Sequence, residues 1–553
     1  MRLFTNGYRH IQRYRQILNV ISKHGLDHLL DFIGIKNPLR FTGRRKKVNV
    51  YRSTALRVKM VLEELGPAFI KLGQLLSIRP DLLPPNYLVE LEKLQDHVAP
   101  VDFNQISEII ESELQRPISA VFTEIDPNPI AAASIGQVHS GRLITGEAVV
   151  VKVQRPGVKK IVATDLEILR DIASFLESRT EWGRAYNVVG LVDEFSRTIR
   201  DELDYTIEAG NADRFVKNFQ TDPTVRFPKA FWKYSTRQML VLEAVAGIKV
   251  NNAVSCEESE ANKASASKNL VNAILKQLLI DGFFHADPHP GNIVLAPNGV
   301  ILFLDFGMVG RLNNWMRERL VFLMLNLIQE NVTNIVDILM EIGDIKGATN
   351  RKALRHEIFY LFDKYYHRPL NRIHIGTALR ELLGLAWGYR FKFPKELSLI
   401  ARCLFLLEST VSKLTPECSL LELSRPFGSK LLREQLSWPY LSKTGLTFFQ
   451  DWLFFSLELP ERLKSIFRSV ENGELKFNLE HQNFDNFITK MNLIGNRLSF
   501  SLIIAAIIVG SSLIAQQTQL ALFGSFPIAE AGFIIAVLMG VWLLVSIIRS
   551  GKI

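Results

Sequence analysis

A lysine, two aspartates and an asparagine are spaced along the chain in a way that suits phosphoryl-transfer chemistry. Lys152 closes the apolar run AVVVK, and HADPHPGN (285–292) contains Asp287 and Asn292, five positions apart. Asp305 follows thirteen positions later, at the end of the apolar run VILFL. In this chemistry a lysine neutralises phosphate charge, one aspartate orients the attacking group, and an asparagine and a second aspartate hold Mg²⁺. We therefore predict a site for Mg²⁺·ATP, with Lys152 and Asp287 in catalysis and Asn292 and Asp305 as metal ligands.

The segment AAASIGQVHSG (131–141) has the spacing of a glycine-rich phosphate loop in which alanine replaces glycine. The protein-kinase pattern G-x-G-x-x-G-x-V, anchored at its valine, places two alanines on the first two glycines and a glycine on the third. Because alanine resists positive φ, we expect this loop to cover the phosphates in a less open geometry than a glycine loop. The candidate nucleotide contacts are Ala131, Ala133, Ser134, Gly136, Val138 and, at the end of the strand-like run QMLVLEAV, Glu243 and Val245.

The elements around these residues follow the order of an α+β, protein-kinase-like fold with two lobes. Short β-rich runs lie in 121–155, long charged helical patterns lie in 160–218, and QMLVLEAV (238–245) is an apolar strand-like run. Two more short strands precede Asp-Phe-Gly, and the chain from 308 to about 487 is expected to be helical. The pattern predicts a small mixed lobe followed by a mostly helical lobe.

The chain after Asp-Phe-Gly lacks the parts that present a peptide to a protein kinase. An A-P-E motif is absent, and a helical pattern begins by about Trp315, which leaves little room for an activation loop. We therefore expect ATP hydrolysis or phosphorylation of a small molecule, and not phosphorylation of proteins in trans.

Two apolar segments near the end of the sequence, 498–515 and 528–548, are each about long enough to cross ~30 Å of hydrocarbon at ~1.5 Å per residue. Small residues in them would allow close contact between two helices: Gly510, Ser511, Gly532 and Gly540. Basic residues flank the pair on both outer sides. We expect a two-helix transmembrane hairpin at 497–548 with both ends on the cytoplasmic side. The alternative is a buried helical hairpin in a soluble protein.

Composition narrows the class of protein. Of 553 residues, 47% are hydrophobic and 22% are charged, which is typical of a globular chain with several domains. The net charge is +10, but we find no basic stripe interleaved with aromatic residues. We therefore expect a nearby anionic lipid surface and no nucleic acid. The cysteines Cys256, Cys403 and Cys418 share no C-x-x-C spacing, which argues against a zinc site and favours a reducing compartment.

Several motifs together resemble the UbiB, or aarF-domain, family of atypical kinase-like proteins. They run over about 240 residues, and several are specific to that family: KLGQLLSIRPDLLP (71–84), AAASIGQVH (131–139), VVVKVQRPG (149–157), DELDYTIEAGN (201–211), FFHADPHPGN (283–292) and LDFGMVG (304–310). A C-terminal membrane hairpin is also typical of many members. The resemblance implies a kinase-like fold with an N-terminal helical extension.

The resemblance also implies roles that spacing alone leaves open. Lys71 and Gln74 match the K-x-G-Q motif of the extension over the nucleotide cleft, and Glu202 and Asp204 match the E-x-D motif that pairs with it. Glu208 matches the glutamate that holds the strand lysine. Glu167, much nearer to the lysine in the sequence, is the alternative that ordinary kinases would suggest.

The expected function is that of an ATP- and Mg²⁺-dependent ATPase or small-molecule kinase that supports prenylquinone biosynthesis. Its expected partners are membrane lipids, prenylquinone precursors and other quinone-biosynthesis proteins. The expected location is a bacterial inner membrane, a thylakoid membrane or an equivalent organelle membrane. Two alternatives stay open: a pseudokinase scaffold that binds nucleotide as a switch, and a true kinase of a lipid or isoprenoid alcohol. The expected domains are a basic helical segment (1–52), a helical extension (53–120), an N-lobe with inserted helices (121–246), a C-lobe (247–430), a helical linker (431–490) and the hairpin (497–548).

Overall fold

The computed structural model forms two units, Met1–Leu441 and Ser442–Ile553, which are considered separately. The described residues are 2–26, 53–77, 79, 82–94, 98–180, 183–184, 187–253, 260–329, 331–343, 351–366, 375–389, 394–435, 464, 484–516 and 528–549. Most of the expected basic segment 1–52 and most of the expected linker 431–490 therefore lie outside the described residues.

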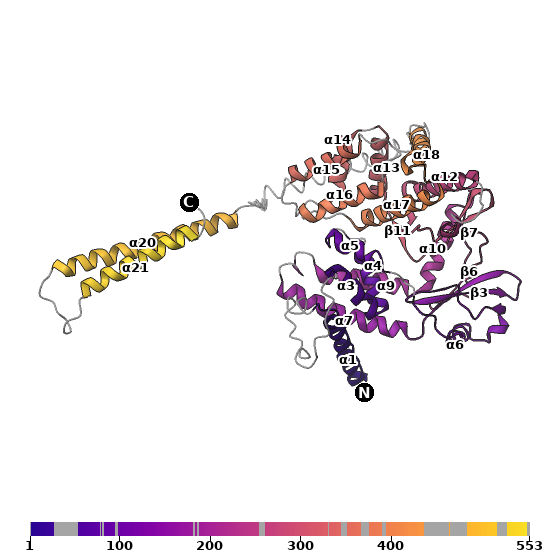
Figure 1. Ribbon diagram of the computed structural model, residues 1–553, viewed down its shortest axis with the longest axis horizontal. Coiled ribbons are helices and arrows are strands. Elements are labelled where there is room, and N and C mark those ends of the chain that lie inside the picture. The colour runs from indigo at the N-terminus through magenta and orange to yellow at the C-terminus, as the bar shows by residue number, and fades with distance from the viewer. Residues whose placement is uncertain are drawn as a thin grey trace. The chain divides into compact units, whose positions relative to one another are not determined.

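A helical extension begins the first unit (Figure 1). Its helices are α1 (Arg2–Lys23), α3 (Thr54–Leu65), α4 (Pro67–Ser77) and α5 (Pro85–Leu91). Ser53 caps α3 by accepting a hydrogen bond from the Leu56 N–H. Gly66, at φ 95°, ends α3 and separates it from α4. Their apolar faces form one core with α7 (Val158–Arg179) and α9 (Val188–Glu202), and this core holds the extension against the N-lobe.

An antiparallel sheet of order β1-β3-β4-β6 forms the N-lobe, and β2 pairs with β3 at its edge. The strands are β1 (Phe122–Ile125), β2 (Ala131–Ala132), β3 (Gly136–Leu143), β4 (Ala148–Gln154) and β6 (Met239–Glu243). Val149, Val151 and Val153 alternate along β4, are fully buried, and pack with α6 (Phe103–Leu114). Lys152 therefore points to the opposite face of the sheet, because side chains alternate along a strand.

The helix α10 (Tyr205–Asn218) lies between the two lobes (Figure 1). Asp204 caps it by accepting a hydrogen bond from the Thr206 N–H. Its N-terminal half packs against β6, and Phe215 enters the core of the C-lobe. One helix thus carries residues that contact both lobes.

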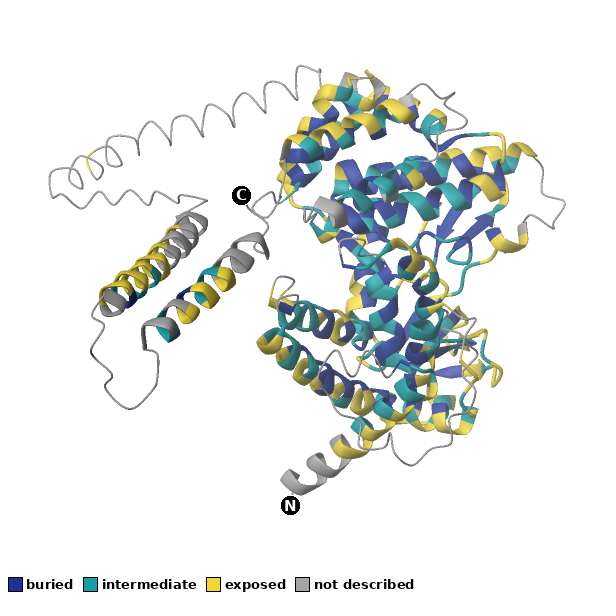
Figure 2. Ribbon diagram, turned by 60° about the vertical axis from the view of Figure 1, so that its left-hand side comes forward, coloured by how far each residue is buried: buried dark blue, intermediate teal, exposed yellow. Residues whose placement is uncertain are grey.

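The C-lobe contains a sheet of order β5-β10-β9-β7 and a separate β8–β11 pair, both covered by helices whose buried faces meet in one core (Figure 2). Its strands are β5 (Val225–Arg226), β7 (Ile248–Lys249), β8 (Phe283–His285), β9 (Ile293–Ala296), β10 (Val300–Phe303) and β11 (Val309–Arg311). Its helices are α11 (Val250–Ala253), α12 (Glu260–Lys276), α13 (Asn314–Ile328), α14 (Val332–Ile342), α15 (Arg351–Tyr366), α16 (Ile375–Tyr389), α17 (Lys395–Leu414) and α18 (Leu420–Gln435). The expectation of an all-helical chain after 308 is wrong at β11, a strand because it completes a ladder with β8.

The second unit contains α20 (Phe484–Gln516) and α21 (Ile528–Arg549), which pack against each other. Of the small residues expected at their contact, Gly532 meets Ser511 so closely that a Cβ would overlap the serine side chain, whereas Gly510 and Gly540 face open space. Within the described residues, no helix combines the length and the apolar character needed to cross a membrane. The helical hairpin is thus present, and the transmembrane crossing expected of 497–548 is not confirmed.

Candidate nucleotide-binding site

Lys152 and Glu208 form the ion pair at the centre of the site. The Lys152 Nζ lies 2.9 and 2.8 Å from the two Glu208 carboxylate oxygens, and 3.8 Å from Asp305 Oδ1. Burial favours the neutral amine, but the carboxylates of Asp305 and Glu208 outweigh it, and the pKa of Lys152 lies above its ordinary value. Lys152 therefore stays protonated between two carboxylates. Glu167, the alternative partner, is exposed on α7.

The alanine loop is a tight hairpin between β2 and β3. Ala131 pairs with Val138, the Ala133 N–H donates to the Gly136 carbonyl at 2.8 Å, and Val138 lies opposite Lys152 in the ladder. Ser134 is buried within the turn. Among the described residues with positive φ, none belongs to this loop, so its alanines adopt ordinary β-hairpin geometry.

Gly136 is required by packing and not by its φ angle. A Cβ on this residue would overlap the Tyr205 hydroxyl and would lie 2.7 Å from the Val153 carbonyl oxygen. Tyr205, at the start of α10, is buried, and its ring lies 5.3 Å from the Lys152 ammonium. The third glycine position of the loop thus lets α10 approach the strand that carries the lysine.

Asp287 and Asn292 lie in the loop between β8 and β9. The Asn292 Nδ2 donates to the Asp287 carbonyl at 3.3 Å, and Arg402 from α17 donates to Asp287 Oδ1 at 2.9 Å. Burial alone would raise the pKa of Asp287, but Arg402 and, farther off, His289 outweigh it and hold this pKa below its ordinary value. Asp287 is therefore ionised at neutral pH.

His285 ties this loop to Asp305. Its Nδ1 accepts a hydrogen bond from the Asp287 N–H at 3.2 Å, and its Nε2 donates to the Asp305 carbonyl at 2.7 Å. The imidazole is buried, so it positions two backbone segments and does not face a substrate. The His285 ring thus links the backbone of Asp287 to that of Asp305, although eighteen positions separate the two residues in the sequence.

Asp305 follows β10 with a left-handed backbone at φ 53°, a conformation that costs energy in a residue other than glycine. The charge of Lys152 is the largest cause that holds the pKa of Asp305 well below its usual range. The helix α10 clamps the neighbouring Phe306 from both sides: Glu208 Oε1 accepts from its N–H at 3.3 Å, and Asn211 Nδ2 donates to its carbonyl at 3.0 Å. The Asp305 carboxylate is held as an anion at a defined place.

Asp305 and Asn292 fit a magnesium ion in the manner of a nucleotide site. Mg²⁺ prefers hard oxygen ligands and is held by one or two protein groups together with phosphates and water. The Asn292 nitrogen donates to protein, so its amide oxygen is the atom that a cation would use. In the described part of the chain no group of three or more His, Cys, Asp or Glu side chains could hold a metal, so the remaining ligands would come from the nucleotide and water.

The extension places one positive charge, that of Lys71, where it acts on Asp305. The Lys71 Nζ lies 3.4 Å from Glu202 Oε2, and the positive charge of Lys71 also helps to lower the pKa of Asp305. Gln74 instead donates to the Leu94 carbonyl at 3.3 Å, within the extension. Asp204 caps α10 and pairs with Arg237 at 3.3 Å. Of the four residues of the two motifs, Lys71 and Glu202 form an ion pair, whereas Gln74 and Asp204 contact residues outside the motifs.

Glu243 and Val245 lie where the chain passes from β6 to β7, between the two sheets. The Glu243 backbone N–H donates to the Lys229 carbonyl at 2.9 Å, and its exposed carboxylate accepts from the Lys229 N–H at 3.3 Å. Val245 is half-buried in the connection that follows.

Two arginines that the sequence motifs did not single out, Arg155 and Arg402, hold the site. The Arg155 Nε donates to the Ala133 carbonyl at 2.8 Å, and its Nη2 donates to the Ala99 carbonyl at 2.7 Å, so this side chain clamps the alanine loop. The sequence offered one signal for Arg155, because this residue lies only three positions after Lys152. Arg402 gave none, because the pattern around it is an ordinary amphipathic helix.

The helix α17 also supports the loop between β8 and β9 at two positions beside Arg402. The Cys403 thiol lies 3.2 Å from the His285 carbonyl, and the Thr410 hydroxyl donates to the Pro288 carbonyl at 2.9 Å. Burial raises the pKa of Cys403, so this thiol is a structural group and not a nucleophile.

Comparisons with known proteins agree with this geometry. The ABC1 atypical kinase-like domain matches residues 93–339, the UbiB helical domain matches 358–419, and the ABC1/UbiB kinase-like C-terminal domain matches 482–549. The chain is 33% identical to an uncharacterized protein of the hydrogenase 1 5′ region of Clostridium pasteurianum, over 98% of this chain and 99% of that protein. It is 31% identical to the probable protein kinase UbiB of Marinobacter nauticus, over 82% and 84% of the two chains.

A plant relative is similar at the same level. The protein named ACTIVITY OF BC1 COMPLEX KINASE 7, chloroplastic, of Arabidopsis thaliana is 32% identical over 88% of this chain and 71% of that protein. Matches of this extent, together with the Lys152–Glu208 pair and the loops that carry Asp287 and Asp305, show that the chain belongs to the ABC1/UbiB family of atypical kinase-like proteins.

Proposed function

We propose that this protein binds Mg²⁺·ATP and transfers its terminal phosphoryl group to water or to a small, apolar acceptor. The observation that carries the proposal is the position of Lys152, whose ammonium lies between Glu208 and the ionised Asp305. A kinase-like domain uses such a lysine on the phosphates, a glutamate to orient it, and an aspartate near the metal.

Each side chain has a role that its surroundings support. Lys152 would bind the phosphates and Glu208 would orient it, while Asp305 and Asn292 would hold Mg²⁺, which would neutralise phosphate charge. Asp287 Oδ1 accepts from Arg402, so Oδ2 is the atom that would orient an attacking hydroxyl or water and accept its proton.

The acceptor is proposed to be small because the chain leaves no length for a peptide platform. After Gly307 the chain enters β11 at once, and α13 begins at Asn314. An activation loop that supports a peptide needs a longer connection than these few residues. Support of prenylquinone synthesis, with a quinone precursor or a lipid as the acceptor, is the finer form of the proposal and rests on family resemblance.

The test is Mg²⁺-dependent ATP hydrolysis by the full chain and by Asp305→Asn. We expect turnover to fall by at least about 10²-fold, because the metal loses its charged ligand. Asp193→Asn, which removes a carboxylate from an exposed pair with Arg170, is the matched control and should leave turnover unchanged. Equal turnover in Asp305→Asn and in the parent chain would rule out this site. Incubation with labelled ATP and a lipid extract separates the acceptors, since a labelled lipid indicates a kinase and free phosphate indicates an ATPase.

A second function, a nucleotide-binding scaffold without turnover, is favoured by one observation. Arg402 occupies one oxygen of the Asp287 carboxylate, which would otherwise be free for a substrate. This function requires that Asp287→Asn binds nucleotide as tightly as the parent chain and still restores quinone levels in a deletion strain. Loss of rescue with retained nucleotide binding would favour the enzyme.

Attachment to a membrane through the second unit is part of the proposal. Its support is the set of large apolar side chains exposed on both helices, among them Leu502 and Val509 on α20 and Leu538 and Trp542 on α21. The measurement is co-sedimentation of the full chain with phosphatidylglycerol vesicles, where Leu502→Glu/Leu538→Glu should reduce binding and Met491→Glu, outside the apolar run, should not.

A further inference from the structure

The carboxylate of Asp287 and the imidazole of His289 face each other across a short gap. The Asp287 Oδ2 and the His289 Nε2 lie 3.9 Å apart, which is longer than a hydrogen bond. Solvent reaches both side chains, since that of Asp287 is 22% exposed and that of His289 is 41% exposed. Because Asp287 Oδ1 accepts a hydrogen bond from Arg402, Oδ2 and Nε2 are the atoms with which this pair would contact a ligand.

A backbone contact fixes which nitrogen of the His289 ring carries hydrogen. The Gly291 N–H donates to His289 Nδ1 at 2.9 Å, so Nδ1 is an acceptor and the ring hydrogen lies on Nε2. The ring packs directly on Gly291, because a Cβ there would lie 2.7 Å from His289 Cε1. The pair therefore presents a hydrogen-bond donor, His289 Nε2, beside an acceptor, Asp287 Oδ2.

The short segment that carries the two side chains is rigid. His289 lies between Pro288 and Pro290, and each proline fixes its own φ near about −65°. The His289 N–H donates to the Asp287 carbonyl at 2.8 Å. Thr410 on α17 donates to the Pro288 carbonyl at 2.9 Å, which fixes the segment to the C-lobe. The distance between donor and acceptor is thus set by the protein and does not depend on a ligand.

We propose that His289 is a catalytic residue that binds the phosphoryl acceptor together with Asp287, and that the pair selects a hydroxyl oxygen, that of an alcohol or of water. This inference rests on the proposed function and adds the chemical class of its acceptor. An oxygen at ~2.7–3.0 Å from both atoms, the usual length of such hydrogen bonds, spans the gap of 3.9 Å. That oxygen donates its hydrogen to Asp287 Oδ2 and accepts the hydrogen of His289 Nε2.

The two hydrogen bonds orient the acceptor oxygen for attack. The oxygen of an alcohol has four tetrahedral directions, which are its carbon, its hydrogen and two lone pairs. When the hydrogen points to Asp287 and one lone pair accepts from His289, the second lone pair is left to form the bond to the terminal phosphorus of ATP. The bond from that phosphorus to the bridging oxygen breaks, and its electron pair leaves on ADP. The acceptor's proton passes to Asp287, and His289 keeps its own hydrogen.

The same pair excludes other head groups. An alkylammonium carries hydrogens for Asp287 but has no lone pair to accept from His289. A carboxylate has lone pairs but no hydrogen to donate, and its charge repels that of Asp287. A site built to hydrogen-bond a hydroxyl rejects an analogue that lacks it by about 10⁴–10⁵-fold. The geometry therefore favours a hydroxyl as the acceptor.

Two substitutions of His289 separate its donor from a structural role. Glutamine places an amide N–H near the position of Nε2, whereas asparagine places an amide oxygen near Nδ1, where it accepts from Gly291, and leaves no donor at Nε2. We expect kcat for ATP hydrolysis by the full chain to fall at least about tenfold in His289→Asn and to stay within about threefold in His289→Gln. The dissociation constant of Mg²⁺·ADP should be the same in both variants as in the parent chain, because the contact is made with the acceptor.

The order of the two variants decides the role of His289. Activity retained in His289→Asn and lost in His289→Gln would assign the ring to the backbone contact alone and would overturn the inference, as would equal kcat in the two variants. Thermal melts and Mg²⁺·ADP binding show that each variant is folded. His356→Asn, at an exposed position of α15, is the matched control and should keep the parent kcat. Absence of turnover in the parent chain would instead contradict the proposed function, and with it any catalytic role of His289.

Three compounds that share one alkyl chain test the acceptor class. The parent chain is incubated with γ-labelled ATP and n-hexanol, n-hexylamine or hexanoate, and the labelled products are identified. Label on hexanol would show that the pair binds an alcohol, and free phosphate as the product with all three would show that it binds water. Label on hexylamine or on hexanoate would overturn the selection of a hydroxyl.

Discussion

Arg402 donates a 2.9 Å hydrogen bond to the carboxylate of Asp287, although 115 positions separate the two residues. The pair places a helix-borne guanidinium against the carboxylate proposed to orient the attacking group. Arg402 holds the pKa of Asp287 below its ordinary value against the opposing effect of burial. The acid limit of activity should therefore depend on a residue of α17.

Replacement of Arg402 by glutamine should move the acidic limb of the pH profile of kcat/KM to higher pH. Without the guanidinium, burial becomes the main influence on Asp287 and raises its pKa, so the ionised form that accepts a proton is lost at a higher pH. We expect a shift of at least about one pH unit, since a close opposite charge moves a carboxyl pKa by about 1–3 units. Arg402→Lys should shift the limb less. Lys413→Gln, which removes a charge elsewhere on α17, should not shift it, and an unmoved limb in Arg402→Gln would contradict this role.

Replacement of Glu208 by glutamine should lower kcat/KM for ATP hydrolysis by about 10²-fold, the size of effect that follows from a misplaced catalytic group. The reason is that Lys152 loses the charge that orients it and turns toward Asp305, which lies 3.8 Å away. Glu167→Gln is the matched control, because Glu167 is the nearer glutamate in the sequence but is exposed on α7. Steady-state kinetics beside a thermal melt separate a loss of orientation from a loss of folded protein. Equal kinetics in the two variants would show that the pair has no catalytic role.

Replacement of Ala133 by glycine should raise the affinity for Mg²⁺·ATP and lower the free energy of unfolding by about 0.4–1 kcal/mol. Glycine adds freedom to the unfolded chain and lets the turn at 133–135 open so that backbone N–H groups reach the phosphates. Ala148→Gly places the same change at the exposed start of β4 and should destabilise the fold without altering affinity. Nucleotide affinity from fluorescence titration and stability from urea denaturation provide the two measurements. If affinity is the same in Ala133→Gly and Ala148→Gly, the methyl group of the loop has no part in binding.

Replacement of Gly136 by alanine should destabilise the protein by about 1–3 kcal/mol, the usual cost of forcing extra volume into a packed site. The added Cβ meets the Tyr205 hydroxyl and the Val153 carbonyl oxygen. Gly210→Ala in α10 is the contrasting control, since a Cβ there meets open space and alanine favours a helix by about 0.5–1 kcal/mol over glycine. Urea denaturation should also show a smaller cost for Gly136→Ala in a Tyr205→Phe background, which removes one of the two clashes. The same cost in both backgrounds would mean that the hydroxyl is not the obstacle.

The sequence by itself predicted most of the elements and the candidate residues of the site, because those signals are local. The alternation of Val149, Val151 and Val153 is enough to predict a strand with Lys152 on its opposite face, and Asp-Phe-Gly after an apolar run is enough to predict a metal-side aspartate at the end of β10. The family resemblance identified Glu208 as the partner of Lys152. Spacing alone would have assigned that role to Glu167.

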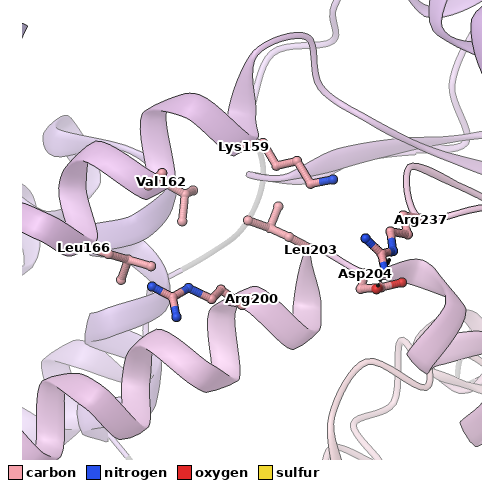
Figure 3. A pocket seen from close by; sticks show the side chains of 8 residues that line it. Lys159, Val162, Leu166, Arg200, Leu203, Asp204 and Arg237 are labelled. Carbon is pink, nitrogen blue, oxygen red and sulfur yellow. Dashed lines mark ion pairs between the residues drawn. The ribbon is translucent and has the colours of Figure 1, made fainter. Parts of the chain in front are cut away.

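Tertiary structure decided the partners, because a contact between distant segments leaves no periodic mark in either of them. Arg402 meets Asp287, Arg155 meets the alanine loop and Gly136 meets Tyr205 only because the helices α10 and α17 pack where they do. Lys71 and Gln74 lie three positions apart on the helix α4, yet Lys71 pairs with Glu202 and Gln74 donates to the Leu94 carbonyl. The cavity lined by residues of α7, α9 and the turn before β6 (Figure 3) likewise exists only once these elements have folded together, because its lining comes from segments that lie far apart in the sequence.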